Sequence, residues 1–288
     1  MTDIDDLKAI DQKTVGRTPT PQAMVFTVLG SYCLETNPLI PTSMYFDILG
    51  RVGVNEHAAR MTLVRMRDRG YVTAKKSGRE AFWSATEMGL SIVTRQRKWT
   101  FHERSTLPDP DGVWTIVSFS LPEVRRRDRD GLRQRLAWEG FGCLRDGVWI
   151  SPGERDVSEI VLQRGDDTSI EEYVDSFVGV PKHTDIGRMI ARAWHLPDLL
   201  ARYQQFLDQW DVPHPVPEAV DALGAKILLI TNWRQLARET PLLDEKYLPE
   251  GWPAHRCMEV FLRTQQTYEA DADRIFAELM ASAATETA

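Results

Sequence analysis

Hydrophobic and polar residues between positions 41 and 86 follow a pattern that predicts a helix, a turn, a second helix and a hairpin. After a turn at Val52-Gly53, small or apolar side chains recur at three- and four-residue intervals, which is typical of a helix with one buried face. The members of this buried stripe are Ala59, Thr62, Leu63 and Met66. Asn55 stands where a helix cap is expected, and Gly70 stands where the helix is expected to end.

Two short strands are predicted after this helix, at residues 71–74 and 81–84, because aromatic and β-branched residues occur there on both sides of a glycine-containing turn. Cationic side chains surround that turn, namely Lys75, Lys76 and Arg79. The face of the second helix that is expected to be exposed carries His57, Arg60, Met61 and Arg65. This order of elements, with cations on the second helix and on the hairpin, predicts a winged helix-turn-helix at residues 20–104.

The second helix of such a domain reads base edges in the major groove, while its flanks and the wing meet phosphates. Arg60, in the first half of the helix, is the best candidate for a bidentate contact with guanine. The full predicted DNA-binding set is Asn55, His57, Arg60, Met61, Arg65, Lys75, Lys76 and Arg79. A basic helix face is also typical of an ordinary solvated surface, and some winged domains contact only proteins. A protein-interaction module is therefore one alternative.

The distribution of charge supports DNA binding, although the formal net charge of -7 does not. Residues 51–104 hold 12 Lys and Arg against 5 Asp and Glu, so this segment carries +7 and the remainder carries -14. Phosphate neutralisation supplies most of the non-specific affinity of a DNA-binding protein. A basic DNA-binding segment joined to an acidic body would have this charge pattern.

The rest of the chain predicts two further domains and an α+β fold. Residues 105–112 have the composition of a linker. Residues 112–181 then predict the order β-α-β-β-α-β, which is typical of a ferredoxin-like plait. From residue 183 to residue 283 apolar side chains follow a helical period, with proline-rich breaks near 213–217 and 241–253. This last segment is expected to be an all-α effector and dimerisation domain.

Composition limits the class of protein further. With 288 residues, 42% hydrophobic and 27% charged, the chain is long enough for two or three domains. Its first residues are polar and acidic, unlike a signal peptide, and no apolar run approaches the ~18 residues of a membrane span. We therefore expect a cytoplasmic protein without a membrane partner. The three cysteines lack metal-ligand spacing, and we expect no metal site.

Taken together, these segments resemble the PaaX-like repressors of phenylacetic-acid catabolism over roughly residues 20 to 280. The segment from Asn55 to Met66, followed by Gly70-Tyr71-Val72, resembles the family's recognition helix and its exit into the wing. The middle segment resembles the family's central domain, itself similar to a CRISPR-associated ferredoxin-like subunit. Trp194-His195-Leu196 and Trp252-Pro253 resemble the C-terminal signature. Two departures are the looser Pro241-Leu242-Leu243 and Ala254 where glycine is usual.

The resemblance implies a bacterial transcriptional repressor that binds a palindromic operator as a homodimer. It also implies release from double-stranded DNA by an acyl- or aryl-coenzyme A effector, with no bound cofactor. A thioester of this kind needs cations for its phosphates and an apolar slot for its acyl group. The candidate ligand-binding residues, expected between the plait and the helical domain, are Arg125, Arg126, Arg127, Arg188, Arg192 and Trp194.

Enzymatic alternatives have weaker support. A metal-dependent nuclease would need an acidic residue at the end of the plait's first strand, where the sequence has Ser118-Phe119-Ser120. A metal-independent hydrolase would use His183 with Asp185, or His195 with Asp198, but neither pair has an accompanying nucleophile motif. We therefore predict no catalytic residues and no enzyme activity, and the hydrolase stays the second alternative.

Overall fold

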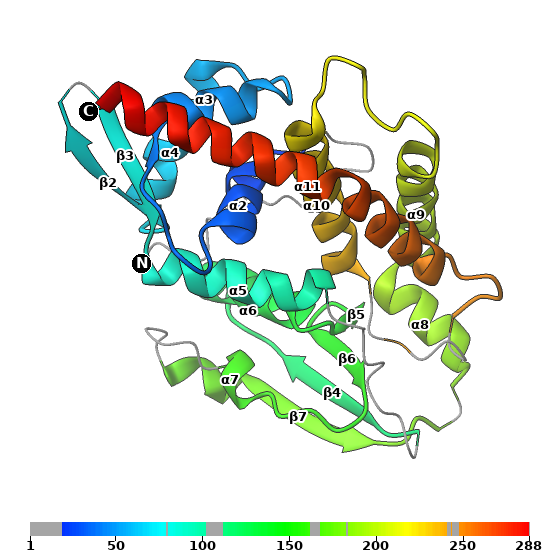
Figure 1. Ribbon diagram of the computed structural model, residues 1–288. Coiled ribbons are helices and arrows are strands. Elements are labelled where there is room, and N and C mark those ends of the chain that lie inside the picture. Colours follow the sequence, from blue (N-terminus) through cyan, green and yellow to red (C-terminus); the bar gives the residue numbers. More distant parts are fainter. Residues whose placement is uncertain are drawn as a thin grey trace. The chain divides into compact units, whose positions relative to one another are not determined.

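The computed structural model describes residues 19–78, 80–101, 112–161, 168–182, 184–240, 243 and 248–287 (Figure 1). Contacts between residues divide the chain into two compact units. The first unit comprises Met1–His102, Gln204–Gln235 and Ala254–Ala288, and the second comprises Glu103–Tyr203 and Leu236–Pro253. Within the described residues, no helix is both long and apolar enough to cross a membrane.

The first unit begins with three helices. These are α2 (Pro21–Tyr32), α3 (Thr42–Gly50) and α4 (Glu56–Asp68). Thr20 caps α2 by accepting a hydrogen bond from the Ala23 backbone at 3.3 Å, and Pro21 occupies the first helical position, where no N–H is needed. Six consecutive residues of α2, Met24–Leu29, are buried, so this helix packs on more than one side.

A small antiparallel sheet and a fourth helix follow. The strands are β1 (Ile40–Pro41), β2 (Val72–Ser77) and β3 (Glu80–Ala85), in the order β1-β3-β2. Thr86 accepts a hydrogen bond from the Gly89 backbone at 3.1 Å and so caps α5 (Glu87–Phe101). A Cβ at Gly89 would lie 2.1 Å from the carbonyl oxygen of Tyr71, so only glycine allows α5 to start this close to the end of α4.

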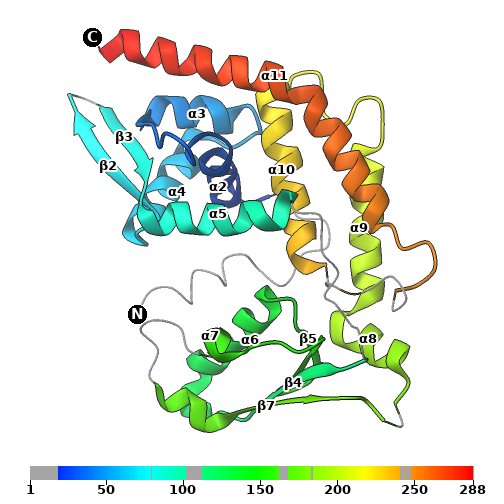
Figure 2. The same ribbon diagram turned by 60° about the horizontal axis from the view of Figure 1, so that its bottom comes forward.

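Helices from the end of the chain complete the first unit. They are the last residues of α9 (Leu196–Trp210), most of α10 (Ala222–Glu239) and α11 (Ala254–Thr287). Trp233 of α10 lies between Phe206 and Phe261, with ring centres 5.6 and 5.0 Å away. The core around α2, α3 and α4 includes side chains of α10 and α11. In both views α2 lies between α5 and α11, with α10 beside it (Figure 1 and Figure 2).

The second unit is built on a four-stranded antiparallel sheet. Its strands are β4 (Trp114–Phe119), β5 (Gly142–Arg145), β6 (Val148–Pro152) and β7 (Val174–Gly179), in the order β5-β6-β4-β7. Helix α6 (Arg126–Trp138) connects β4 to β5, and α7 (Ser158–Val161) lies between β6 and β7. Short 3-10 turns occur at Glu123–Arg125 and Thr168–Tyr173. This is the β-α-β-β-α-β order predicted for residues 112–181.

Side chains of β4 alternate between two cores on opposite faces of this sheet. Val117 and Phe119 pack with Leu132 and Leu136 of α6. Trp114, on the other face, packs with residues of α8 (Ile186–Trp194). Figure 2 shows α6 and α7 together on one side of the sheet. Helices α6 and α8 therefore pack on opposite faces of the sheet.

The predicted mixed α+β class is confirmed, with helices first, antiparallel sheets in the middle and helices at the end. The sequence pattern did not predict α2 or β1. The three-domain boundaries stay a prediction, and the contacts add that the C-terminal helices do not form a group of their own. Instead, α10 and α11 share a core with the first helices of the chain.

Candidate nucleic-acid interface and candidate ligand residues

The sequence fixes helix α4 at both ends. Asn55 accepts a hydrogen bond from the Ala58 backbone at 2.9 Å, so the predicted cap is confirmed, and the Asn55 side-chain oxygen is occupied by this role. At the other end Gly70 has a φ of +78°, and Tyr71 N–H donates to the Met66 carbonyl at 2.9 Å. The Asn55 cap and Gly70 thus set where the helix begins and where it ends.

The two faces of α4 differ in the way the helical period predicts. The buried residues are Ala59, Thr62, Leu63 and Met66, as expected from the sequence. The opposite face leaves four of the predicted DNA-binding residues exposed, namely His57, Arg60, Met61 and Arg65. A hydrophobic base on one side and exposed polar and cationic groups on the other are what a helix needs to lie in a DNA groove.

Arg60 and Arg65 of α4 have no carboxylate partner within the described residues, whereas Arg67 pairs with Asp68 at 2.9 Å. The Arg60 guanidinium carbon lies 4.9 Å from the ring centre of Phe46 on α3, and Arg65 donates to the Thr62 hydroxyl at 3.4 Å. Contact with an aromatic face orients Arg60 but leaves its charge uncompensated. Both arginines can therefore still interact with an external anion.

The β2–β3 hairpin is attached to α3 through strand β3 and carries cations on strand β2. The Trp83 indole donates a hydrogen bond to the Thr42 hydroxyl at 2.8 Å, which holds β3 against the start of α3. Lys75 and Lys76 are exposed toward the turn end of β2, without an ion pair in the described part of the chain. Arg79, which the sequence predicts beside them, lies outside the described residues.

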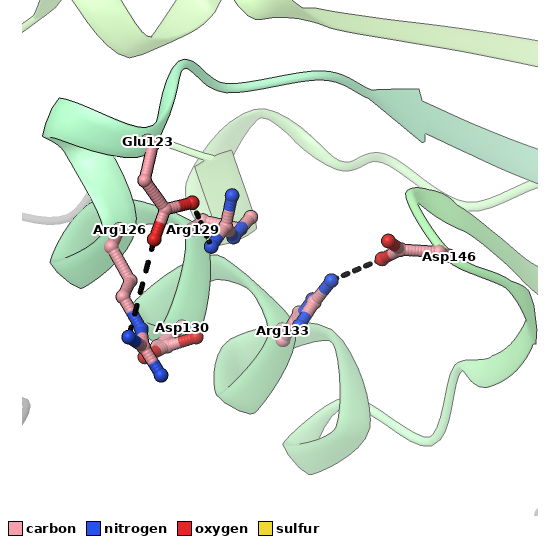
Figure 3. A network of polar contacts seen from close by, with 6 residues as sticks. All are labelled: Glu123, Arg126, Arg129, Asp130, Arg133 and Asp146. Atoms are coloured by element: carbon pink, nitrogen blue, oxygen red, sulfur yellow. Dashed lines mark hydrogen bonds and ion pairs between the residues drawn. The ribbon is translucent and has the colours of Figure 1, made fainter.

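Carboxylates surround the arginines at the start of α6 (Figure 3). Arg126 lies 4.0 Å from Glu123 and 4.0 Å from Asp130, and Glu123 also pairs with Arg129 at 2.9 Å. These pairs are exposed or half-exposed, so each adds little stability. Their effect is to compensate much of the positive charge that would attract a phosphate.

The other arginines in and just before this helix differ in their surroundings. Arg125 donates to Asp128 at 2.9 Å, and further along α6 Arg133 pairs with Asp146 (Figure 3). Arg127 is exposed. Of the predicted cluster Arg125-Arg126-Arg127, the first two members therefore have acidic neighbours on their own helix or just before it.

Trp194, the aromatic residue predicted to meet a ligand, is engaged in packing. Its indole N–H donates to the Gly140 carbonyl at 3.2 Å, and a Cβ at Gly142 would lie only 2.6 Å from its ring. The absence of a side chain at Gly142 is therefore what lets the ring lie against the β5 backbone. Arg188 and Arg192 are exposed on the same helix, α8.

The structure does not bring the six candidate ligand residues together. Helix α6 has 13 residues and is therefore about 20 Å long. Arg125–Arg127 lie at its start, whereas Trp194 contacts Gly140 just beyond its end. Helix α8, which carries Arg188 and Arg192, packs on the opposite face of the sheet. These residues provide two separate surfaces rather than one pocket.

The residues considered for a hydrolase have structural roles where they are described. Asp185 caps α8, and the hydrogen bond from the Arg188 backbone lowers the pKa of its carboxyl. His195 has a φ of +48° at the junction between α8 and α9. His183 lies outside the described residues. Among the residues that the structure describes, no three His, Cys, Asp or Glu side chains are grouped as metal ligands.

The cysteines are free thiols. Cys33 and Cys257 are buried, and burial raises the pKa of each thiol to about 12. Burial also raises the pKa of Cys143, which is half-buried. At neutral pH these groups are protonated and weakly nucleophilic.

One charged residue in a buried position was missed by the sequence analysis. Lys226 is only 5% exposed on α10, between the core residues Leu223 and Ile230, and its ammonium lies 2.6 Å from Asp273 of α11. A lysine on an otherwise apolar helical stripe is an available signal, because a buried charge requires a partner or a ligand. Its carboxylate partner, 47 residues away, gives no local signal.

Comparison with family models covers most of the chain. Residues 20–89 match the model described as PaaX-like protein, residues 108–191 match the PaaX protein central Cas2-like domain, and residues 194–278 match the PaaX-like protein C-terminal domain. The chain belongs to the PaaX-like family. Its first matched segment contains α2 to β3 and every predicted DNA-binding residue that the structure describes.

Two individual proteins extend this comparison. The PaaX-like chain is 25% identical over 229 residues to the transcriptional repressor PaaX of Escherichia coli strain K12, covering 76% of this chain and 71% of that protein. Its fold is similar, with a TM-score of 0.58, to the solved structure of the uncharacterized protein Rv0674 from Mycobacterium tuberculosis. That match covers 90% of this chain and 99% of the other at 17% identity, so it supports the fold alone.

Proposed function

We propose that this chain is a bacterial transcriptional regulator that binds double-stranded operator DNA through a winged helix-turn-helix. In this proposal α3 and α4 are the two helices, α4 enters the major groove, and the β2–β3 hairpin is the wing. The observation that carries it is a set of exposed cations with no carboxylate partner in the described part of the chain, namely Arg60 and Arg65 on α4 with Lys75 and Lys76 on β2. Family membership and the named repressor among its relatives support the same function.

The proposal includes repression, a homodimer and an effector. One short helix reads few base pairs, so two copies on a palindromic operator would raise both affinity and specificity. The relative's name as a repressor supports negative regulation. The effector class proposed from the family is an acyl- or aryl-coenzyme A thioester that releases the protein from DNA, which requires the thioester to prefer the state that does not bind DNA.

Electrophoretic mobility shift with the promoter region of the chain's own gene is the primary test. We expect a specific shift that survives excess random DNA and is reversed by phenylacetyl-coenzyme A but not by free phenylacetate. Retarded complexes with no sequence preference would contradict a specific regulator. If the chain binds no DNA but binds another protein through the same hairpin, the protein-interaction module is favoured instead.

Two single substitutions separate base recognition from phosphate contact. Arg60→Ala is expected to reduce the preference for operator over random DNA by about 1–3 kcal/mol, because a bidentate guanine contact is lost. Lys76→Ala is expected to weaken operator and random DNA alike, because phosphates are the same in both. Competition binding against labelled operator measures both effects, and Arg274→Ala on exposed α11 is the control. Equal losses on both DNAs for Arg60→Ala would contradict the proposed role of Arg60.

A further inference from the structure

A cavity of about 360 Å³, open to solvent and with mixed polar and apolar walls, lies among helices of the first unit. Its walls come from four helices, α2, α5, α10 and α11. Three cationic side chains, Arg97, Lys226 and Arg234, and one carboxylate, Glu269, line it. Cavities of this size are at the lower end of small-molecule sites, which usually combine apolar walls with a few polar groups. It therefore has room for a small ligand or for one end of a longer one.

The cations of this cavity have different partners. Lys226 is balanced by Asp273 at 2.6 Å and Glu269 at 3.8 Å, so it ties α10 to α11. Arg234 donates to the Thr27 hydroxyl at 3.1 Å, which brings its guanidinium to the α2 wall. Arg97, on α5, is exposed and has no carboxylate partner among the described residues. Two guanidinium groups thus line the cavity from different helices, a composition suited to an anion.

Other lining groups define the remainder of a ligand. Val93 of α5 and Ile230 of α10 supply apolar surface. Gln265 of α11 has a buried side-chain oxygen that finds no hydrogen-bond partner among the residues the structure describes. A buried polar atom without a partner is unfavourable, and a donor from a ligand or solvent would satisfy it. Cationic, apolar and hydrogen-bonding walls together fit an organic anion better than a purely hydrophobic molecule.

Two of the cavity helices also contact the proposed DNA-reading elements. Asp221, just before α10, pairs with Arg51 at the end of α3. A Cβ at Gly224 of α10 would lie 3.3 Å from the Cβ of Arg51, so the start of α10 lies closely against the turn between α3 and α4. Helix α2 shares its core with α4. A shift of α2 or α10 around a bound molecule would therefore reach α4 directly.

We propose that this cavity binds an organic anion and that its occupation lowers the affinity of α4 and the hairpin for DNA. The carboxylate or phosphate of the ligand meets Arg97 and Arg234, and its apolar part lies against Val93 and Ile230. The regulatory half of this inference rests on the proposed function; the binding half does not. It assigns the effector to the first unit, rather than to the surfaces around Trp194 or the start of α6.

Isothermal titration of the full chain tests the binding half, with phenylacetate, coenzyme A and phenylacetyl-coenzyme A as probes. Binding of phenylacetate identifies a carboxylate as the anion, and binding of coenzyme A identifies a phosphate. The structure predicts that Arg97→Gln raises the dissociation constant of the probe that binds about tenfold or more, because a charge-assisted hydrogen bond is lost. Arg274→Gln makes the same change on α11, where Asp271 and Glu278 pair with the native arginine, and is expected to have no effect.

Arg97 is an exposed side chain, so its variant is expected to fold, and thermal melting checks this. Unchanged affinity in a folded Arg97→Gln protein overturns the cavity site, as does a loss of affinity in Arg127→Gln or Arg188→Gln instead. Binding of none of the probes at millimolar concentration also overturns it. Release of operator DNA by the bound probe, measured by mobility shift, tests the regulatory half. Failure to bind any operator contradicts the proposed function while leaving the titration result standing.

Discussion

At the scale of single residues, Gly142 shows how one missing side chain positions a neighbour. A Cβ there would lie 2.6 Å from the Trp194 ring and 2.8 Å from Ala193, so Gly142→Ala must push α8 away from β5. We expect this substitution to lower the free energy of unfolding by about 1–3 kcal/mol, as overpacking of a filled site does. Urea unfolding followed by circular dichroism measures the change.

Gly179 provides a matched control on the same sheet. A Cβ at this position would meet no atom of the described residues within 4 Å, so Gly179→Ala is expected to change the free energy of unfolding by about 0.5 kcal/mol or less. Similar losses for both variants would mean that glycine matters for backbone freedom in this sheet and not for the approach of Trp194.

The residues of the candidate sites differ in how well the sequence predicts them. The buried stripe of α4 was predicted in full, because spacing along one helix decides which side chains face the core. The DNA-contacting roles of Arg60 and Lys76 stay predictions. Lys226 was missed because its carboxylate partners lie on α11, far along the chain. The ligand role of Trp194 also stays a prediction, and spacing alone does not reveal that its indole N–H donates to the Gly140 carbonyl.

At the scale of elements, the start of α10 depends on one carboxylate. Asp221 accepts a hydrogen bond from the Gly224 backbone at 3.0 Å, which caps the helix, and it also pairs with Arg51. Asp221→Ala removes both interactions and is expected to lower the free energy of unfolding by about 1–2 kcal/mol. Chemical denaturation is the measurement. Glu218→Ala, at an exposed position in the same segment, is the control, and its free energy of unfolding should equal that of the parent protein.

The contact between α9 and α11 gives a pH dependence. Asp211 accepts hydrogen bonds from Arg256 at 2.6 Å and Arg263 at 2.7 Å, and these bonds lower the pKa of its carboxyl. Because the pKa is lower in the folded state, the stabilisation is complete above the ordinary aspartate range. It is lost as pH falls from that range through the lowered pKa. Asp211→Asn should therefore destabilise the protein at pH 7 and have a smaller effect at acidic pH.

The size of this effect is modest, since both arginines are largely exposed. We expect about 0.5–1 kcal/mol at pH 7, measured as the difference in urea unfolding between parent and variant. Asp47→Asn, at an exposed position of α3, is the control. A difference that grows as pH falls would contradict the assignment to Asp211.

Elements with a clear amphipathic period were predicted, and elements without one were not. Helices α4, α5, α6 and α8–α11 each show the helical spacing in sequence. Helix α2 has six consecutive buried residues, which do not distinguish a buried helix from a buried strand. Strand β1 has only two residues and exists through its pairing with Trp83 and Phe82 some 40 positions later. No local pattern encodes such a pairing.

At the scale of the whole molecule, sequence order and spatial grouping differ. The chain predicts three consecutive segments, but residues of α10 and α11 share a core with α2, α3 and α4. Tyr32 of α2 stacks on Phe276 of α11 with ring centres 3.8 Å apart, across 244 positions of sequence. Local periodicity identifies each helix correctly and contains no information on which distant helix it meets. Because of this grouping, residues of α10 and α11 line a cavity together with α2 and α5 of the same unit.

The proposed dimer on DNA can be distinguished from a monomer by its response to salt. Each phosphate contact contributes about 0.9 to the slope of log K against log salt concentration. Lys76→Ala removes one such contact from a monomer, but two from a dimer that presents the same hairpin at both half-sites. We expect operator binding by the variant to show a slope reduced by about 1.8, measured by fluorescence anisotropy at several salt concentrations.

Lys182→Ala, at an exposed position of the second unit, should leave the slope unchanged. A reduction of about 0.9 would indicate that one hairpin meets DNA per bound complex, and no reduction would remove Lys76 from the interface.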